Sequence, residues 1–212
     1  MPFYQHINVD QATHIYIWKI SESFDELFRA VSLKDVSLAR LEGMKSESHQ
    51  KGFLAVRMLL QHKGYTDFDL YYDKFGKPHL KDGVNISISH SFDFSVIVLS
   101  DKNVGIDLEL RRDLVKKIAY KFAEEEFVYE CQHNSEEFVS KLTVIWGVKE
   151  AVFKVRNEVG ISFKDHIFVR PFEMKDQKTT ALLNFNRIKR EFLVYFTEIE
   201  KYTLVWLWET ES

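Results

Sequence analysis

Residues 84–110, with the sequence VNISISHSFDFSVIVLSDKNVGIDLEL, contain three consecutive runs that are typical of β-strands. In residues 84–91 apolar and polar residues alternate strictly, so one face of a strand is apolar and ends at His90. Residues 94–100 and 104–110 are two further strand-like runs, and the connection between them is short enough for an antiparallel hairpin. The middle of the chain is therefore predicted to form β-sheet.

Helical patterns lie on both sides of this central sheet. The order of elements is strand, helices, strands, and then helices and strands again, which predicts an α+β fold and not a regular βαβ array. The seam is expected at residues 101–103, which gives two α+β halves, residues 1–102 and 103–212. The predicted helices are residues 24–41, 47–63, 114–130 and 136–155, and the other predicted strands are residues 14–20, 68–72, 167–170, 180–185, 191–197 and 203–208.

The composition excludes several classes of protein. Acidic and basic residues are interspersed and give a net charge of −3, so there is no broad basic field for nucleic acid or anionic lipid. No run reaches the roughly 18 uninterrupted apolar residues that a membrane span needs. The single cysteine, Cys131, has no partner for an internal disulfide or a thiolate-rich zinc site. We expect a cytoplasmic protein without nucleic-acid or membrane partners.

Two acids lie close together on the predicted strand of residues 104–110. Asp107 and Glu109 are two residues apart, so both carboxylates leave the same face of the strand. Like charges on one face repel unless a cation, a proton or water relieves them. Mg²⁺ takes oxygen ligands and often binds carboxylates together with substrate phosphates, which indicates phosphoryl chemistry. An exposed strand with solvated acids is the alternative from this pair alone.

A third acid lies on one side of the predicted helix of residues 136–155. Trp146, Glu150 and Lys154 follow at intervals of four residues, and Lys149 is beside them in the sequence. Glu150 could complete a metal site while Lys154 holds an anionic ligand. An ordinary Glu–Lys helix pair, which contributes only ~0.3 kcal/mol, is the alternative.

Three further places could bind phosphate. No Gly-x-Ser-x-Gly motif surrounds Ser89 or Ser91, so a hydrolase triad is a poor fit, and His90 at the strand end either donates to a phosphate or bonds to backbone. The turn of residues 76–78 could bring Lys77 to a phosphate, although most such turns are only turns. Arg57 either binds a phosphate through two N–H groups of its guanidinium or is a surface residue whose stem covers apolar area.

These signals occur together and in a fixed order. Gly-Lys-Pro at residues 76–78 is followed by Ile-Ser-His-Ser at 88–91, Gly-Ile-Asp-Leu-Glu at 105–109 and Trp-Gly-Val-Lys-Glu-Ala-Val-Phe-Lys at 146–154. In this order the four blocks resemble the surfactin-synthetase type of 4′-phosphopantetheinyl transferase. The resemblance implies two similar α+β halves with coenzyme A bound in the cleft between them, and a monomer, because one chain builds the whole cleft.

The resemblance also implies roles for individual residues. Asp107, Glu109 and Glu150 would bind Mg²⁺ against the diphosphate of coenzyme A, and Glu150 is the candidate base, acting directly or through a metal-bound water. Asp107 and Lys154 would share in the catalysis. The residues implied to bind coenzyme A are Lys154 and His90 at its phosphates, Ser89 close by, and Arg57, Lys77 and Pro78 at its nucleotide end.

The activity implied is the transfer of the 4′-phosphopantetheine group from coenzyme A to a serine of an apo acyl or peptidyl carrier protein. The products would be the holo carrier and adenosine 3′,5′-bisphosphate. Lys116, Lys117 and Lys121 are candidates for contact with the acidic helix of a carrier. A non-catalytic coenzyme A or carrier-binding module and a metal-dependent phosphohydrolase are the competing hypotheses.

Two positions depart from the family pattern or match it ambiguously. Gly147 follows the tryptophan of the last block, where the family often has a small hydroxyl residue, and glycine lowers helix propensity. The three glutamates at residues 124–126 fall where the family places one acid after a phenylalanine, here Phe122. None of the three is assigned a role from the sequence.

Overall fold

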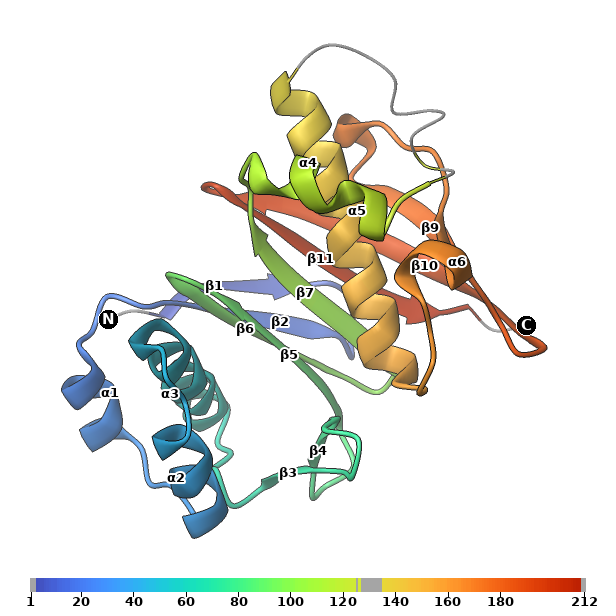
Figure 1. Cartoon of the computed structure of the whole chain (residues 1–212). Coiled ribbons are helices and arrows are strands. Elements are labelled where there is room, and N and C mark those ends of the chain that lie inside the picture. The colour runs from blue at the N-terminus through green and yellow to red at the C-terminus, as the bar shows by residue number, and fades with distance from the viewer. Residues whose placement is uncertain (1–2, 125, 127–134, 211–212) are drawn as a thin grey trace. The chain divides into compact units, whose positions relative to one another are not determined.

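A computed structural model describes residues 3–124, 126 and 135–210 of the chain (Figure 1). The chain divides into two compact units, Met1–Lys102 and Asn103–Ser212. Each unit combines helices with an antiparallel sheet, which confirms the predicted α+β class. No described helix is both long and apolar enough to span a membrane, and Cys131 lies outside the described residues.

The first unit is built on a four-stranded antiparallel sheet with the order β1-β2-β6-β5. Helix α3 packs on one face of this sheet, because its apolar residues recur at helical spacing and are buried. The bounds are Phe3–Asn8 for β1, His14–Lys19 for β2, Asn85–Ser91 for β5, Phe94–Ser100 for β6 and Glu47–His62 for α3; the smaller elements are α1 (Phe24–Ala30), α2 (Asp35–Glu42) and the hairpin of β3 (Leu70–Tyr72) and β4 (Pro78–Leu80).

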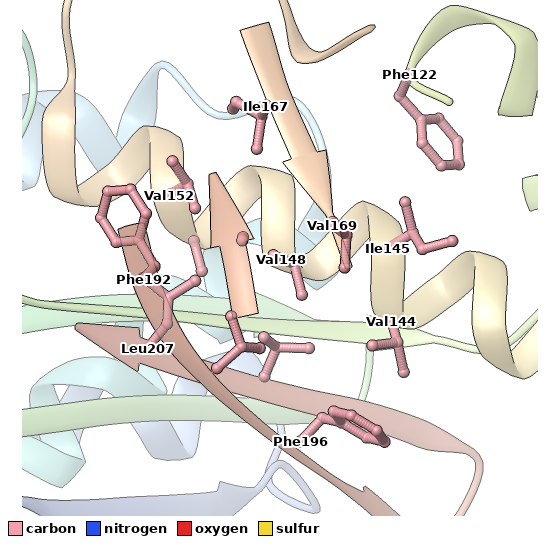
Figure 2. Close-up of a cluster of buried hydrophobic side chains, with 14 of the residues drawn as sticks. Phe122, Val144, Ile145, Val148, Val152, Ile167, Val169, Phe192, Phe196 and Leu207 are labelled. Atoms are coloured by element: carbon pink, nitrogen blue, oxygen red, sulfur yellow. The ribbon is translucent and has the colours of Figure 1, made fainter. Parts of the chain in front are cut away.

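The second unit has a five-stranded antiparallel sheet with the order β7-β11-β10-β9-β8. The long helix α5 (Ser135–Arg156) packs on it, and Figure 2 shows Val148 and Val152 of this helix among side chains from the strands. The bounds are Val104–Leu110 for β7, Ile167–Val169 for β8, Lys178–Phe185 for β9, Ile188–Ile199 for β10 and Tyr202–Glu209 for β11, with the short helices α4 (Leu114–Ile118), η1 (Ala119–Lys121), α6 (Phe163–His166) and η3 (Met174–Asp176).

The two units share one connectivity when each is considered alone. In the first, β2 is followed by helices and pairs antiparallel with the last strand, β6, which also pairs with β5. In the second, β7 is followed by helices and pairs antiparallel with the last strand, β11, which also pairs with β10. The order of elements therefore recurs although the sequence shows no fixed-period repeat.

The predicted hairpin between residues 94–100 and 104–110 is wrong. The strands β6 and β7 belong to different sheets: β6 is buried between β2 and β5, and β7 pairs with β11. A short connection permits a hairpin but does not require one, since each strand pairs where its apolar residues find a matching surface. A tight turn joins β9 to β10, because Phe185 pairs with Ile188 and the two residues between them have positive φ.

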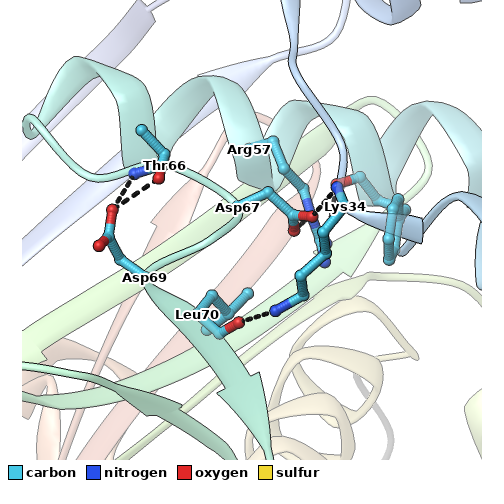
Figure 3. Close-up of polar contacts among 7 residues, drawn as sticks. Lys34, Arg57, Thr66, Asp67, Asp69 and Leu70 are labelled. Carbon is cyan, nitrogen blue, oxygen red and sulfur yellow. Dashed lines mark hydrogen bonds and ion pairs between the residues drawn. The ribbon is translucent and has the colours of Figure 1, made fainter. Parts of the chain in front are cut away.

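Two predicted helices are shorter than expected. Residues 24–41 form two helices, α1 and α2, separated by extended backbone at Val31 and Lys34. The backbone N–H of Lys34 donates to Asp67 and its ammonium donates to the carbonyl of Leu70, so contacts outside the helix hold this break (Figure 3). The helix expected over residues 114–130 is α4 followed by η1, and residues 127–130 lie outside the described part. Strands β1 and β4 and helix α6 were not predicted.

Helix α5 approaches β7 at a glycine. A Cβ atom added to Gly105 would overlap the carbonyl oxygen of Ala151 and lie 2.8 Å from Cγ2 of Val155. The backbone of α5 thus rests directly on the strand, and this contact sets how far the helix stands from the acids on β7.

We predict that Gly105→Ala destabilises the protein by about 1–3 kcal/mol, because the added methyl group forces α5 away from the sheet. Gly43→Ala is the matched control, since a Cβ at Gly43 has its nearest neighbours at 3.5 Å and φ is −72°. Urea unfolding followed by circular dichroism measures both. Equal stability of the two variants would show that the helix adjusts without cost.

Candidate active site

The strand β7 and the helix α5 bring four predicted site residues together in the second unit. Gly105, Asp107 and Glu109 alternate along β7, so the two acids share the face on which Gly105 contacts α5. Glu150 and Lys154 lie one turn apart on α5. Asp107 is only 3 % exposed, so its carboxylate is buried beneath the helix. The alternative interpretation, an exposed strand with solvated acids, is therefore excluded for Asp107.

Two hydrogen bonds from α5 hold the acids of β7. The Lys154 ammonium donates to Oδ1 of Asp107 at 2.8 Å and to the carbonyl oxygen of Ile106 at 2.9 Å. One helix turn before Glu150, Trp146 donates its indole N–H to Oε1 of Glu109 at 3.0 Å. The helix face predicted from the spacing of these residues is therefore the face that meets the strand.

The protonation of Glu109 and Glu150 depends on their burial and on the neighbouring charges. Burial raises the pKa of Glu109 to about 7, and the charge of Asp107 adds to this, although the bond from Trp146 and the charge of Lys154 oppose it. Burial also raises the pKa of Glu150 to about 7, again with the charge of Asp107 adding and that of Lys154 opposing. Three acids therefore share one partly buried region in which negative charge is costly.

This donor set suits a hard cation by its chemistry. Carboxylate oxygens are the ligands that Mg²⁺ prefers, and a cation would relieve the crowding of Asp107, Glu109 and Glu150. Within the described part of the chain, however, no three His, Cys, Asp or Glu side chains are arranged as a metal site, and the Lys154 ammonium occupies Oδ1 of Asp107. The residues fit Mg²⁺ in kind, and magnesium binding remains a proposal.

Glycine at position 147 allows the helix to approach the acids. A Cβ atom there would lie 2.9 Å from Cγ2 of Val205 and 3.4 Å from Oδ2 of Asp107. The departure from the family pattern therefore falls beside the buried carboxylate, at a position where a larger side chain would crowd the side chain of Val205 on β11.

In the first unit the other predicted residues lie in three separate places. Ser89 is buried near the end of β5, and the exposed His90 that follows it packs its ring against Gly52 of α3. The second place is the turn before β4, where the backbone N–H of Lys77 donates to Asp73 at 3.0 Å and Pro78 begins the strand.

Arg57 is the third of these places and is only 2 % exposed. Figure 3 shows its side chain beside Asp67. Its Nε donates to Oδ1 of Asp67 at 3.0 Å, and Nη1 donates to the carbonyl of Phe53 at 3.2 Å. The guanidinium also lies 3.4 Å from the centre of the Phe53 ring. The structure thus buries this arginine in an ion pair and does not present it on the surface.

Sequence reasoning missed the ion pair between Glu126 and Lys149. The Lys149 ammonium is fully buried and donates to Oε1 of Glu126 at 2.7 Å and to the carbonyls of Phe122 at 2.6 Å and Phe163 at 3.0 Å. Glu126 also accepts from the backbone N–H of Val169 at 3.2 Å. A lysine within an apolar helix signals a buried partner, but three adjacent glutamates offered no way to choose among them.

The comparisons with known proteins agree with the resemblance. Residues 103–205 match the model of the 4′-phosphopantetheinyl transferase superfamily, which confirms the predicted resemblance for the unit that holds Asp107, Glu109, Glu150 and Lys154. The chain is also similar to the 4′-phosphopantetheinyl transferase gsp of Aneurinibacillus migulanus, and the two sequences are 26% identical over 128 residues. The alignment covers 60% of this chain and 52% of that protein, so the chain spans about half the length of its relative.

We predict that Glu126→Gln destabilises the protein by about 3–5 kcal/mol, because it leaves the charge of Lys149 buried without a carboxylate. Glu124→Gln is the matched control: this side chain is exposed, 3.3 Å from Lys164, and its loss should cost about 0–1 kcal/mol. Urea unfolding midpoints distinguish the two. Similar midpoints would mean that the buried pair contributes no more than a surface pair.

Proposed function

We propose that the protein is a magnesium-dependent 4′-phosphopantetheinyl transferase. It transfers the phosphopantetheine arm of coenzyme A to a serine of an apo acyl or peptidyl carrier protein and releases adenosine 3′,5′-bisphosphate. The observation that carries the proposal is the gathering of Asp107, Glu109, Glu150 and Lys154 between β7 and α5, within the residues that match the transferase superfamily.

The proposed reaction exchanges the phosphoanhydride bond of coenzyme A for a phosphodiester bond to the carrier serine. The serine oxygen of the carrier attacks the phosphorus that bears the pantetheine arm, and the bond from this phosphorus to the bridging oxygen of the diphosphate breaks. Negative charge develops on the phosphoryl and leaving oxygens. Lys154 is proposed to stabilise this charge, and its effect would be stronger because the region around it is partly buried.

Asp107, Glu109 and Glu150 are the proposed ligands of Mg²⁺, which when bound would neutralise the diphosphate and polarise its oxygens. Asp107 and Glu109 each accept a hydrogen bond from α5, from Lys154 and Trp146 respectively. These two bonds orient the carboxylates on a rigid strand before any ligand arrives.

Glu150 is the proposed base that takes the serine proton. Asp107 is bonded to Lys154 and Glu109 to Trp146, whereas the contacts described for Glu150 include neither a hydrogen bond nor an ion pair. No hydrogen-bond donor among the described contacts would have to leave Glu150 before it takes the proton, either directly or through a metal-bound water. Glu150 therefore suits proton transfer best among the three.

Coenzyme A would also contact the first unit. His90 is exposed at the end of β5 and can donate to a phosphate, with Ser89 beside it. Lys77 and Pro78 are proposed to meet the nucleotide end. Arg57 would serve that end indirectly, by holding α3 to the turn that contains Asp67, because its guanidinium is buried.

On the second unit, Lys116, Lys117 and Lys121 of α4 and η1 are the proposed contacts with the carrier protein. The protein is also proposed to act as a monomer in the cytoplasm.

Intact mass spectrometry of a panel of apo carrier proteins tests the activity. Incubation with coenzyme A and MgCl₂ is expected to add one phosphopantetheine to at least one carrier, and EDTA is expected to prevent the addition. Release of free phosphopantetheine without any acceptor would replace the proposal by a phosphohydrolase. Tight coenzyme A binding with no product on any carrier would replace it by a binding module.

Glu150→Ala is expected to lower the transfer rate by at least about 10²-fold while leaving the unfolding midpoint unchanged, because the described contacts of Glu150 include no hydrogen bond that the substitution removes. Glu137→Ala removes an exposed acid from the same helix and should transfer at the wild-type rate. Unchanged transfer by Glu150→Ala would remove this residue as the base and as a necessary metal ligand.

A further inference from the structure

Two histidines meet on the first unit, on two strands that carry no residue of the proposed active site. His6 lies on β1 and His14 on β2, and the register pairs His6 with Tyr16 and Asn8 with His14. The two imidazoles are therefore diagonal neighbours on one face of the sheet. Nε2 of His6 and Nδ1 of His14 are 3.3 Å apart.

This separation matches that of two ligands on one metal ion. Imidazole nitrogens bind Zn²⁺ at about 2.0–2.1 Å, and two such nitrogens at a tetrahedral angle are about 3.3 Å apart. We propose that His6 and His14 form a two-imidazole site for a first-row transition metal ion that favours nitrogen ligands, such as Zn²⁺, Ni²⁺ or Cu²⁺. No third protein ligand completes the site among the residues that the structure describes, so water fills the remaining positions.

The two side chains are held in place before a metal arrives. Both stand on hydrogen-bonded strands, so their Cα atoms are fixed by the ladder between β1 and β2. The ring of His6 stacks on that of Tyr16, with centroids 4.6 Å apart and an angle of 10° between the planes. Tyr16 is itself buried in the core of the unit. His6 is exposed and His14 half-buried, so an ion can reach the pair from solvent.

The surroundings of His6 favour its uncharged imidazole, the form that binds metals. Burial and then the nearby charges of His14, Lys63 and His62 lower the pKa of His6. Between two ring nitrogens 3.3 Å apart there is room for one proton, and a metal ion replaces that proton. No acid is needed to balance a bound divalent ion, since the site stays open to water and counterions.

The site would be chemically distinct from the carboxylates of the second unit. Carboxylate oxygens suit Mg²⁺, whereas imidazole suits the later transition metals. A bound ion would join β1 to β2 through two side chains, in addition to the backbone ladder. Because β1 is an edge strand whose ladder partner is β2, the ion would stabilise the outer part of the sheet.

The test is calorimetric titration of the full chain with ZnCl₂, repeated with NiCl₂. His14→Ala and His6→Ala are each expected to lose at least about tenfold in affinity, since even the loss of an outer-shell partner of a metal ligand costs about 10–100-fold. His79→Ala is the matched control, a histidine on β4 of the same unit but in a different sheet. It should bind as the wild type does.

Two further measurements localise the effect. The ring resonances of His6 and His14 should shift in NMR spectra with Zn²⁺ and not with Mg²⁺, and Zn²⁺ should raise the thermal midpoint of the wild type more than that of His14→Ala. Transfer by His14→Ala should equal that of the wild type, so failure of this site and failure of the proposed transferase activity are separate results. Wild-type zinc affinity in a folded His14→Ala variant, or unshifted His6 and His14 resonances, would overturn the proposal.

Discussion

The close contact of α5 with β7 is the constraint on which the second unit depends. The helix rests its backbone on the strand at Gly105, and a second glycine, Gly147, faces Asp107 and Val205. A side chain at Gly105 would overlap the backbone of α5, and one at Gly147 would crowd Val205 and Asp107. The close approach keeps Lys154 and Trp146 within hydrogen-bond distance of the acids of the strand. Two residues without side chains thus determine the geometry of the residues that carry charge.

This contact has an electrostatic cost that the unit offsets with specific partners. Asp107 and Lys149 are both buried, and each meets an opposite charge at hydrogen-bond distance, from Lys154 and Glu126 respectively. A buried ion without such a partner would be strongly destabilising. Burial, and then the charge of Asp107, raises the pKa values of Glu109 and Glu150, so negative charge on these two acids is costly without a further cation. A region with this imbalance is prepared for a positively charged ligand.

Local patterns in the sequence were sufficient to predict much of this arrangement. The two-residue spacing of Asp107 and Glu109 and the four-residue spacing of Trp146, Glu150 and Lys154 each determine a face, because strand and helix periods are fixed by backbone geometry. The α+β class followed from the order of such patterns.

Pairings between distant residues could not be predicted in this way. Nothing near β7 in the sequence indicates that it pairs with β11 and not with β6, since strand choice depends on the match of whole apolar faces. The sequence does not indicate which of three adjacent glutamates is buried, and the structure shows that it is Glu126, paired with Lys149. The residues next to Arg57 in the sequence do not show whether its side chain points into solvent or toward Asp67. The ion pair with Asp67 becomes evident only in the folded structure.

In each unit the strand before the helices pairs with the last strand of the unit, β2 with β6 and β7 with β11, and this pairing has an evolutionary consequence. Val104 lies opposite Trp208 in the ladder of β7 and β11, and His14 lies opposite Leu99 in that of β2 and β6. The polypeptide therefore enters and leaves each of these strand–helix–strand modules at adjacent points, about 5 Å apart. A gene segment that encodes such a module can be copied in tandem, or inserted into another gene, without any rethreading of the chain.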